Sequence, residues 1–519
     1  MIFISRSPHV VSVVRQADDH LLHSRRPWTL LMAVLLTLFL MNRPVFGLVL
    51  TDDTIRRSIE RHVVSEAGLT PDQIDIKIKD GIAILSGSVN NLLQKSRVRQ
   101  IAESIRGVRS VVDTVAVKPV IRENEVIARD VRDNLGQIPP DRGLDVSVSV
   151  DRGIVTLKGT ADSWVLSRLA VFQAMSINGV SEVVNQIDVK TRPERDDTNI
   201  ALDVKRRLAA DLYVDDALVE VTVKDGRVTL DGIVGTMAEK RRAADNAWIS
   251  GVTGVDDRHL LVNWQEKDRM RRTSPYIRQS DQTILQTVKE ALLMDPRVNA
   301  TNPDVEVANG AVTLSGAVDT LYAKQAAADD ARSTTGVWRV DNRLQLRYRS
   351  FPPDDQVKGM IEDVFRRDAE MNALDIGVAV NDHHVRLSGT VDSMGQKVRA
   401  ENIASQIEGV LTLDNRIAVK AKADITSDAD MKAAIADELF WSPYVDSDRI
   451  GVTVKDGQAI LKGTAASRFV AHTAVQNAFE GGAKTVQTKL VLDDGSTMSE
   501  WFAEETYPFR LGRIFSFRP

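Results

Sequence analysis

One hairpin-like phrase occurs six times in this sequence of 519 residues. Its first occurrence, KDGIAILSGSV at 79–89, has a turn pair, an alternating apolar strand and a glycine, which is typical of the second half of a β-hairpin. The glycine recurs every 72 to 74 residues, apart from one gap of 84. We interpret these glycines as structural turn residues: Gly87, Gly159, Gly232, Gly316, Gly389 and Gly463. The period exceeds the roughly 20–50 residues of a solenoid repeat, so each unit is expected to be a small domain with its own core.

Each repeat contains the same order of predicted elements. Apolar residues at every fourth position, such as Ile55, Ile59 and Val63, predict a short amphipathic helix ahead of the phrase. Alternating stretches then predict two strands with one apolar face, and a second helix ends at a glycine such as Gly107. A short apolar strand closes the unit. This order predicts an α+β fold, a tandem array of six small αββαβ sandwiches, each with two helices on a three-stranded mixed sheet.

The hairpin pattern D-G-x-V-x-L-x-G and the later G-V-x-x-V-x-N, which GVWRVDN at 336–342 approaches, resemble the BON domain (bacterial osmotically inducible Y and nodulation domain). Two copies depart from the pattern. NDHH at 381–384 replaces the Asp-Gly pair, and EGGA at 480–483 replaces Gly-Val, so we expect altered turn geometry there rather than a different fold. The expected copies span 51–119, 120–191, 195–264, 279–348, 351–421 and 425–494.

An N-terminal segment, residues 1–50, precedes the repeats. It holds the apolar run WTLLMAVLLTLFLM at 28–41, directly after Arg25, Arg26 and Pro27. A positive flank and a short apolar core are typical of a secretory signal peptide, and an uncleaved membrane anchor or a buried helix are the alternatives. The sequence thus predicts a periplasmic protein, which this segment anchors to the inner membrane if it is not cleaved.

Two further segments lie outside the repeats. Residues 265–278 form a basic linker between the third and fourth copies, and 495–519 form an aromatic and basic tail. Aromatic and basic residues together suit an anionic membrane surface, whereas docking of the aromatic rings onto the last copy is the alternative. The candidate membrane-contact residues are Trp501, Phe509, Arg510, Arg513, Phe515 and Phe517.

No catalytic pattern stands out in the sequence. The chain has no cysteine, which excludes a thiolate zinc site and a cysteine nucleophile, and it lacks H-E-x-x-H, G-x-S-x-G and the phosphate-binding loops. His383 and His384 are adjacent, and adjacent strand residues point to opposite faces, so this pair indicates a polar hairpin tip. The recurring residues are apolar residues and glycines. We therefore expect no enzymatic activity, no cofactor and no metal, and the net charge of −5 argues against a nucleic-acid partner.

The resemblance to the BON family implies a bacterial envelope protein that binds phospholipid or the membrane surface and supports envelope integrity under osmotic or other stress. Basic residues on the first helices are candidates to meet anionic headgroups. They are Arg56, Arg57, Lys205, Arg206 and Arg207. The alternative is a periplasmic protein–protein interaction scaffold whose edge strands bind envelope proteins or other copies of the same chain. The sequence leaves open which copies contact one another.

Overall fold

A computed structural model describes most of the chain between residues 50 and 503. The described ranges are 50–70, 72–138, 142–190, 195–266, 279–295, 297–298, 303–348, 351–420, 427–442, 444–466, 468–493 and 495–503. The predicted signal or anchor segment up to residue 49, the linker residues 267–278 and the tail residues 504–519 lie outside the described residues. Within these ranges, no helix combines the length and the apolar character that crossing a membrane requires.

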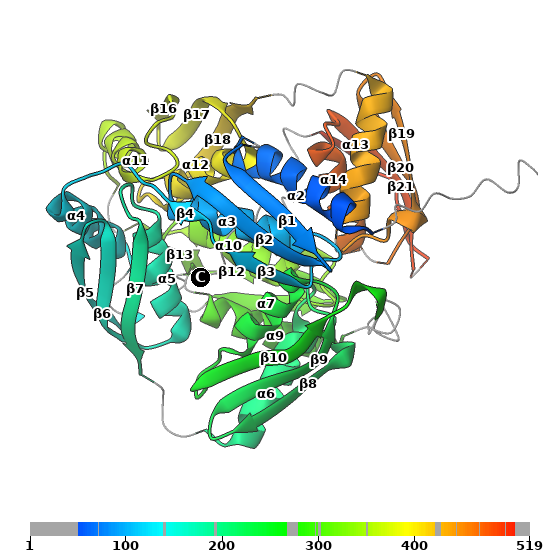
Figure 1. Cartoon of the computed structure of the whole chain (residues 1–519), viewed down its shortest axis with the longest axis horizontal. Helices are drawn as coiled ribbons and strands as arrows, with labels where there is room; N and C mark the ends of the chain where they lie inside the picture. The colour runs from blue at the N-terminus through cyan, green and yellow to red at the C-terminus, as the bar shows by residue number, and fades with distance from the viewer. Residues whose placement is uncertain are drawn as a thin grey trace, which may run out of the picture. The chain divides into compact units, whose positions relative to one another are not determined.

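The first copy shows the plan that all six copies share (Figure 1). Its elements are α2 (Asp52–Ala67), β1 (Ile74–Lys79), β2 (Ile82–Val89), α3 (Leu92–Ser104), β3 (Ser110–Asp113) and β4 (Ala116–Val117). Strand β1 pairs antiparallel with β2, and β2 pairs parallel with β3 and β4. The sheet is therefore mixed, as predicted, and the structure places the second strand of the hairpin in its middle.

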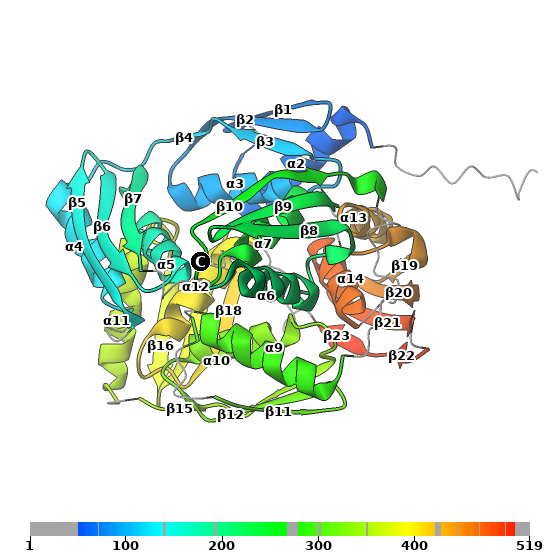
Figure 2. The same cartoon turned by 90° about the horizontal axis from the view of Figure 1, so that it is seen from below.

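The other copies repeat this order, and Figure 2 shows the two helices of the fourth copy on one face of its sheet. The second copy contains α4 (Asn124–Leu135), β5 (Leu144–Asp151), β6 (Ile154–Ala161), α5 (Trp164–Met175) and β7 (Glu182–Val189). The third contains α6 (Asp197–Ala210), η2 (Asp216–Leu218), β8 (Val219–Lys224), β9 (Arg227–Val234), α7 (Met237–Ala247), β10 (Gly254–Val262) and η3 (Trp264–Glu266). The fourth contains α9 (Asp281–Met294), β11 (Asp304–Ala308), β12 (Ala311–Ser315), β13 (Ala317–Val318), α10 (Leu321–Arg332), β14 (Arg339–Asn342) and β15 (Gln345–Leu346).

The last two copies follow the same plan. The fifth contains α11 (Asp354–Arg367), β16 (Ile376–Asn381), β17 (His384–Val391), α12 (Met394–Gln406) and β18 (Thr412–Val419). The sixth contains α13 (Asp428–Trp441), η4 (Ser447–Arg449), β19 (Ile450–Lys455), β20 (Gln458–Ala465), α14 (Arg468–Glu480) and β21 (Thr485–Leu492). Two short strands of the tail, β22 (Thr497–Met498) and β23 (Trp501–Ala503), pair antiparallel with β21 and extend this sheet.

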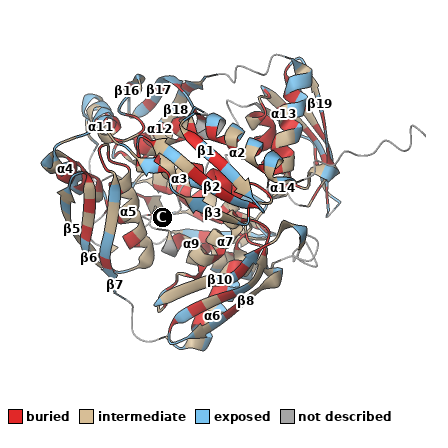
Figure 3. Ribbon diagram, in the orientation of Figure 1, coloured by how far each residue is buried: buried red, intermediate tan, exposed pale blue. Residues whose placement is uncertain are grey.

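Each copy has its own apolar core between its helices and its sheet. In the first copy, the predicted stripe of Ile55, Ile59 and Val63 is buried against Ala83 and Leu85 of β2. Strand residues alternate between buried and exposed, so one face of each sheet packs on the helices and the other faces solvent (Figure 3). This alternation confirms the prediction of sheets that helices cover on one side.

The six recurring glycines lie in a different place from the predicted turns. Five of them lie within the second strand of the hairpin, and Gly316 lies between β12 and β13. Their φ angles range from 109° to 153°, a region that favours glycine. A Cβ atom at Gly389 would lie 2.6 Å from the carbonyl oxygen of Asp375, directly before the neighbouring strand β16. These glycines therefore permit close approach of two strands, and the turn lies earlier, at pairs such as Asp80 and Gly81.

The hairpin turns keep one geometry throughout. Asp80 and Gly81 have φ angles of 50° and 74°, as a type I′ turn requires. In the fifth copy, Asp382 and His383 take the same conformation, with φ angles of 48° and 65°. In the sixth copy, Gly482, with φ 97°, takes the place of the glycine that ends the second helix elsewhere. The altered turn geometry expected at these two places is therefore not found.

A carboxylate at the start of the first helix holds this turn. In the third copy, the two carboxylate oxygens of Asp197 accept hydrogen bonds from the backbone amides of Asp225 and Gly226, both at 2.8 Å. Among the described residues, four other copies make the same pair of bonds, through Asp52, Asp281, Asp354 and Asp428. The negative charge also suits the helix N-terminus. One side chain therefore fixes the first helix to the hairpin, and the second copy has Asn124 at this position.

Candidate functional site

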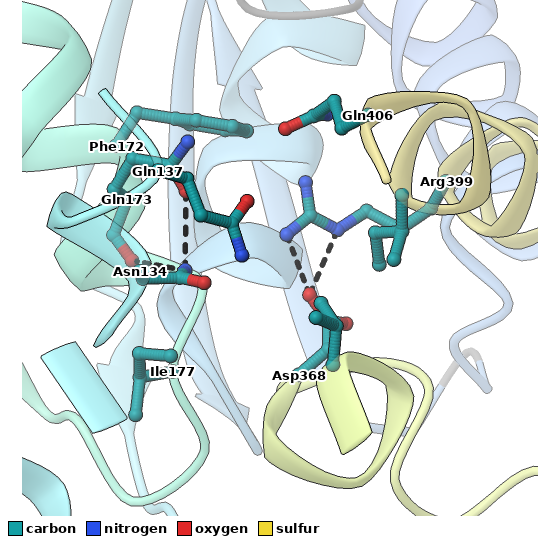
Figure 4. A pocket seen from close by; sticks show the side chains of 10 residues that line it. Asn134, Gln137, Phe172, Gln173, Ile177, Asp368, Arg399 and Gln406 are labelled. Atoms are coloured by element: carbon teal, nitrogen blue, oxygen red, sulfur yellow. Dashed lines mark hydrogen bonds and ion pairs between the residues drawn. The ribbon is translucent and has the colours of Figure 1, made fainter. Parts of the chain in front are cut away.

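A small hollow lies between the second and fifth copies (Figure 4). Its cavity volume is about 30 Å³, which is room for about one water molecule. Four of its polar side chains bond in pairs: the Asn134 amide donates to Gln173 Oε1 at 3.1 Å, and Arg399 Nε donates to Asp368 at 3.0 Å. The hollow is therefore too small for an organic substrate, and these four side chains already have partners.

The described histidines and carboxylates form no group of three or more that is placed to hold a metal ion. His383 lies in the hairpin turn, as predicted, and its ring packs 5.3 Å from the ring of Phe351. His384 begins β17, and its Nδ1 contacts Thr412 of the neighbouring strand. The two histidines thus have separate partners.

The second and fifth copies meet through the ends of two helices. Ile177, which follows α5, and Asp368, which follows α11, form an isolated antiparallel bridge. The amide of Ala369 donates to the carbonyl of Ser176 at 2.8 Å beside it. Two loops that are far apart in the sequence are therefore joined by backbone hydrogen bonds, which fix their register.

The third and fourth copies meet in the same way. Asp211, which follows α6, bridges Thr334, which follows α10, and the amide of Thr335 donates to the carbonyl of Ala210 at 2.9 Å. In both pairs, the end of the first helix of one copy meets the end of the second helix of the other. The pairs are nested, because the third and fourth copies lie between the second and fifth in the sequence.

The first and sixth copies complete this nesting with a side chain in place of the backbone bridge. Arg106, which follows α3, donates to the carbonyl oxygens of Ser442 and Val445, which follow α13. Between the same two copies, His62 of α2 lies 3.1 Å from the carboxylate of Glu438 on α13, and both side chains are buried. Again the end of a first helix contacts the end of a second helix.

Buried ion pairs support the helix ends at two of these junctions. Asp211 accepts from Arg242 at 2.6 Å and from the amide of Asn246 at 2.7 Å. Asp368 accepts from Arg399 in the same way. In both pairs the aspartate and the arginine are 31 residues apart in the sequence. A buried carboxylate is costly unless it is paired, so each arginine stabilises the loop that makes the bridge.

Further contacts join copies that are not paired in this way. The guanidinium of Arg97 in the first copy makes two bonds, at 2.9 and 3.1 Å, with the carboxylate of Glu370 in the fifth. The indole nitrogen of Trp164 in the second copy donates to the carbonyl of Val252 in the third at 3.0 Å, and its ring centre lies 4.4 Å from that of Trp248. The helices and helix ends of the six copies are thus used largely for contacts between copies.

Glu239 of the third copy and His472 of the sixth have shifted pKa values. Burial raises the pKa of Glu239 to about 7, although the amides of Asp215 and Gly235 donate to it at 2.7 and 2.8 Å. Burial, with the nearby charges of Arg468 and Arg332, lowers the pKa of His472 to about 4. Both groups therefore favour the neutral form in the folded protein.

The predicted headgroup-binding residues lie mostly in ion pairs on their own helices. Arg56 pairs with Asp53 and Glu60, and Arg57 pairs with Asp53 as well. Arg206 similarly pairs with Asp203 of its own helix. Their positive charge is therefore partly matched by neighbouring carboxylates.

The described part of the tail docks onto the sixth copy. Met498 is fully buried in the core of that copy, and Phe502 packs against the same core. Trp501 remains 58% exposed. The other candidate membrane-contact residues, Phe509, Arg510, Arg513, Phe515 and Phe517, lie outside the described residues.

Together, these features define a tandem αββαβ repeat protein whose copies are held to one another by helix-end contacts. The chain belongs to the BON domain family. The family model of the BON domain matches residues 51–119, 123–191, 196–263, 280–348, 353–421 and 427–493. These six matches confirm the tandem array expected from the sequence.

The chain is similar to the osmotically-inducible protein Y of Escherichia coli (strain K12). The two are 30% identical over 146 residues, which cover 27% of this chain and 73% of that protein. Two solved structures of CdsD, a structural protein of the type III secretion system of Chlamydia trachomatis, match at 18% identity. They cover 39% and 42% of this chain, and 90% and 99% of their own, with TM-scores of 0.11 and 0.12.

Proposed function

We propose that this chain is a non-enzymatic bacterial envelope protein whose BON copies together bind the phospholipid surface and support envelope integrity under osmotic or other stress. The observation that carries this proposal is the division of each copy into an inner and an outer side. On the inner side, helix residues such as Glu103 are buried and form ion pairs with other copies, in this case with Arg241 of the third copy. Outward strand residues such as Asp75 and Lys77 stay exposed.

A set of exposed sheet faces suits contact with a surface better than capture of a small molecule. Several weak contacts on one chain gain from avidity, because each later contact is effectively intramolecular. Similarity to an osmotically-inducible protein and the apolar run at 28–41 support a role in the envelope, at or near the inner membrane.

Sedimentation of the full chain with phospholipid vesicles tests this function. Vesicles with and without anionic lipid are compared at low and at high salt. We expect the protein to pellet with anionic vesicles and to be partly released at high salt, because exposed charge interactions are screened. A protein that stays in the supernatant with both kinds of vesicle contradicts the proposal.

A protein-binding scaffold is the second candidate, and strand pairing at the edge of the sixth sheet favours it. Strand β23 pairs antiparallel with β21, with Trp501 opposite Gln487 and Ala503 opposite Thr485. This edge thus accepts an extended segment, which is the geometry of partner binding by strand addition. Recovery of one specific envelope protein, with no dependence on lipid, supports the scaffold.

A further inference from the structure

The outer face of the first sheet carries an exposed aliphatic patch. Ile82 and Ile84 of β2 are 38% and 37% exposed, and Val112 of β3 is 44% exposed. Ile84 and Val112 are direct neighbours across the two strands. These side chains point away from the core of their own copy and leave their apolar surface in solvent.

The other five copies show that the fold does not require aliphatic residues there. The pair equivalent to Ile84 and Val112 in the strand register contains at least one polar residue in every sister copy. These pairs are Thr156/Val184, Thr229/Asp256, Thr313/Asp341, Arg386/Asp414 and Ile460/Gln487. The patch is therefore a property of the first copy, and the stability of the sandwich does not explain it.

Basic residues flank the patch on the same face. Lys79 lies opposite Ile82, and Lys77 lies opposite Ile84 on the neighbouring strand β1. Both lysines are exposed, and Lys77 pairs with Asp75 at 2.8 Å on this face. Aliphatic side chains beside lysines suit the boundary between acyl chains and anionic headgroups.

The chain enters the first copy at the same end of the sheet as the patch. Asp52, the first residue of α2, accepts the backbone amides of Asp80 and Gly81, directly before Ile82. Residues 42–50 separate the apolar run at 28–41 from this copy. Nine residues span at most about 30 Å, so a membrane-inserted run keeps the first copy close to the bilayer.

We infer that the outer face of the first sheet, formed by Lys77, Lys79, Ile82, Ile84 and Val112, is a docking surface for an anionic phospholipid membrane. This inference rests on the proposed function and assigns the contact to one copy and one face. The aliphatic side chains enter the headgroup region while the lysines meet the lipid charge. This face combines exposed aliphatic side chains with positive charge.

A polarity-sensitive fluorophore tests the assignment in the full chain, which contains no cysteine of its own. Two single-cysteine variants are labelled, Ile84→Cys in the first copy and Ile460→Cys at the equivalent position of the sixth. Each is mixed with vesicles of neutral lipid and with vesicles that also contain anionic lipid. Pelleting of the same samples is measured in parallel. The variant Ile82→Gln/Ile84→Thr/Val112→Gln, whose new residues occur at these positions in sister copies, is compared in pelleting.

We expect anionic vesicles to raise the emission of the probe at position 84 and to leave the probe at 460 unchanged. The triple variant should bind with an affinity lower by on the order of tenfold, as loss of partly buried aliphatic contact predicts. Pelleting without a change at position 84, or with equal changes at both sites, overturns this inference and leaves the proposed function intact. If the protein does not pellet with either kind of vesicle, both the proposed function and this inference are contradicted. If the emission of the probe at position 84 instead rises with protein concentration in the absence of vesicles, the face binds a second copy of the chain. That result also overturns the inference.

Discussion

The guanidinium carbon of Arg106 lies 4.0 Å from the centre of the Trp264 ring. Arg106 belongs to the first copy and Trp264 to the short helix that ends the third, while the hydrogen bonds of Arg106 go to the carbonyls of Ser442 and Val445 in the sixth. Burial lowers the pKa of Arg106 to about 10, so it remains charged at neutral pH. One buried cation thus joins three copies from different parts of the chain.

Replacement of Arg106 should weaken this three-copy junction. In Arg106→Ala, two buried carbonyl groups lose their donor and the Trp264 ring loses its cation, which we expect to cost roughly 2–3 kcal/mol of unfolding free energy. Urea denaturation measures the loss. The matched control is Arg109→Ala, since Arg109 is exposed and bonds within its own copy, to Asp80. Equal stability of both variants would show that the junction contributes nothing.

The carboxylate that holds each hairpin turn can be tested in the third copy. Asp197→Asn leaves one oxygen for the two amides of Asp225 and Gly226, and we expect a loss of about 1 kcal/mol. Hydrogen exchange of those two amides should also become faster. The control is Asp196→Asn, which removes the same charge one residue earlier, where the side chain makes no capping bond. If hydrogen exchange of these amides becomes faster in both variants, the loss of negative charge alone explains the effect.

The raised pKa of Glu239 predicts a loss of stability as the pH rises. The folded-state pKa of about 7 lies above the unfolded value near 4.5. The stabilisation is therefore complete below pH about 4.5 and is lost as the pH rises through 7, at up to about 1.4 kcal/mol per pH unit. Glu239→Gln should flatten this part of the pH profile in urea denaturation. A profile that is unchanged by the substitution would refute the assignment.

The lowered pKa of His472 predicts the opposite dependence of stability on pH. Its folded-state pKa of about 4 lies below the ordinary value near 6.5, so its contribution is complete above pH about 6.5 and is lost as the pH falls through 4. Protonation brings a positive charge close to Arg468 and Arg332. His472→Gln should therefore reduce the loss of stability on acidification. The same acid-induced loss with and without the imidazole would contradict this account.

The fold of one copy follows from local patterns in the sequence. The spacing of Ile55, Ile59 and Val63 correctly predicts the buried face of α2, because a helical period places them on one side. The sequence also locates the acidic residues at helix starts, but the reach of Asp197 to a turn 28 residues away depends on the packed arrangement of helix and hairpin. The sequence does not separate a turn from a close contact between strands at the six recurring glycines, because both favour glycine.

The contacts between copies could not be predicted from one sequence. Arg97 and Glu370 are separated by 273 residues, and each occupies a position where a charged residue usually faces solvent. Trp264 lies at the edge of a segment that was predicted to be a linker, and nothing near it in the sequence indicates its stacking on Arg106. The copies share one fold but differ in these surface residues, which select the partners.

The nested pairing of copies can be tested most directly by disulfide formation, because the chain has no cysteine of its own. Ser176 and Ala369 lie opposite each other beside the bridge of the second and fifth copies, and Ala210 and Thr335 do so in the third and fourth. Opposed residues of this kind have Cα atoms about 5.5 Å apart, within the range of a disulfide.

The measurement is the yield of intramolecular disulfide in Ser176→Cys/Ala369→Cys and in Ala210→Cys/Thr335→Cys, read by mass spectrometry after mild oxidation of the native protein. The mismatched pair Ser176→Cys/Thr335→Cys is the control. The nested arrangement predicts near-complete closure of both matched pairs and free thiols in the mismatched one. Matched pairs that stay reduced, or a mismatched pair that closes equally well, would contradict it.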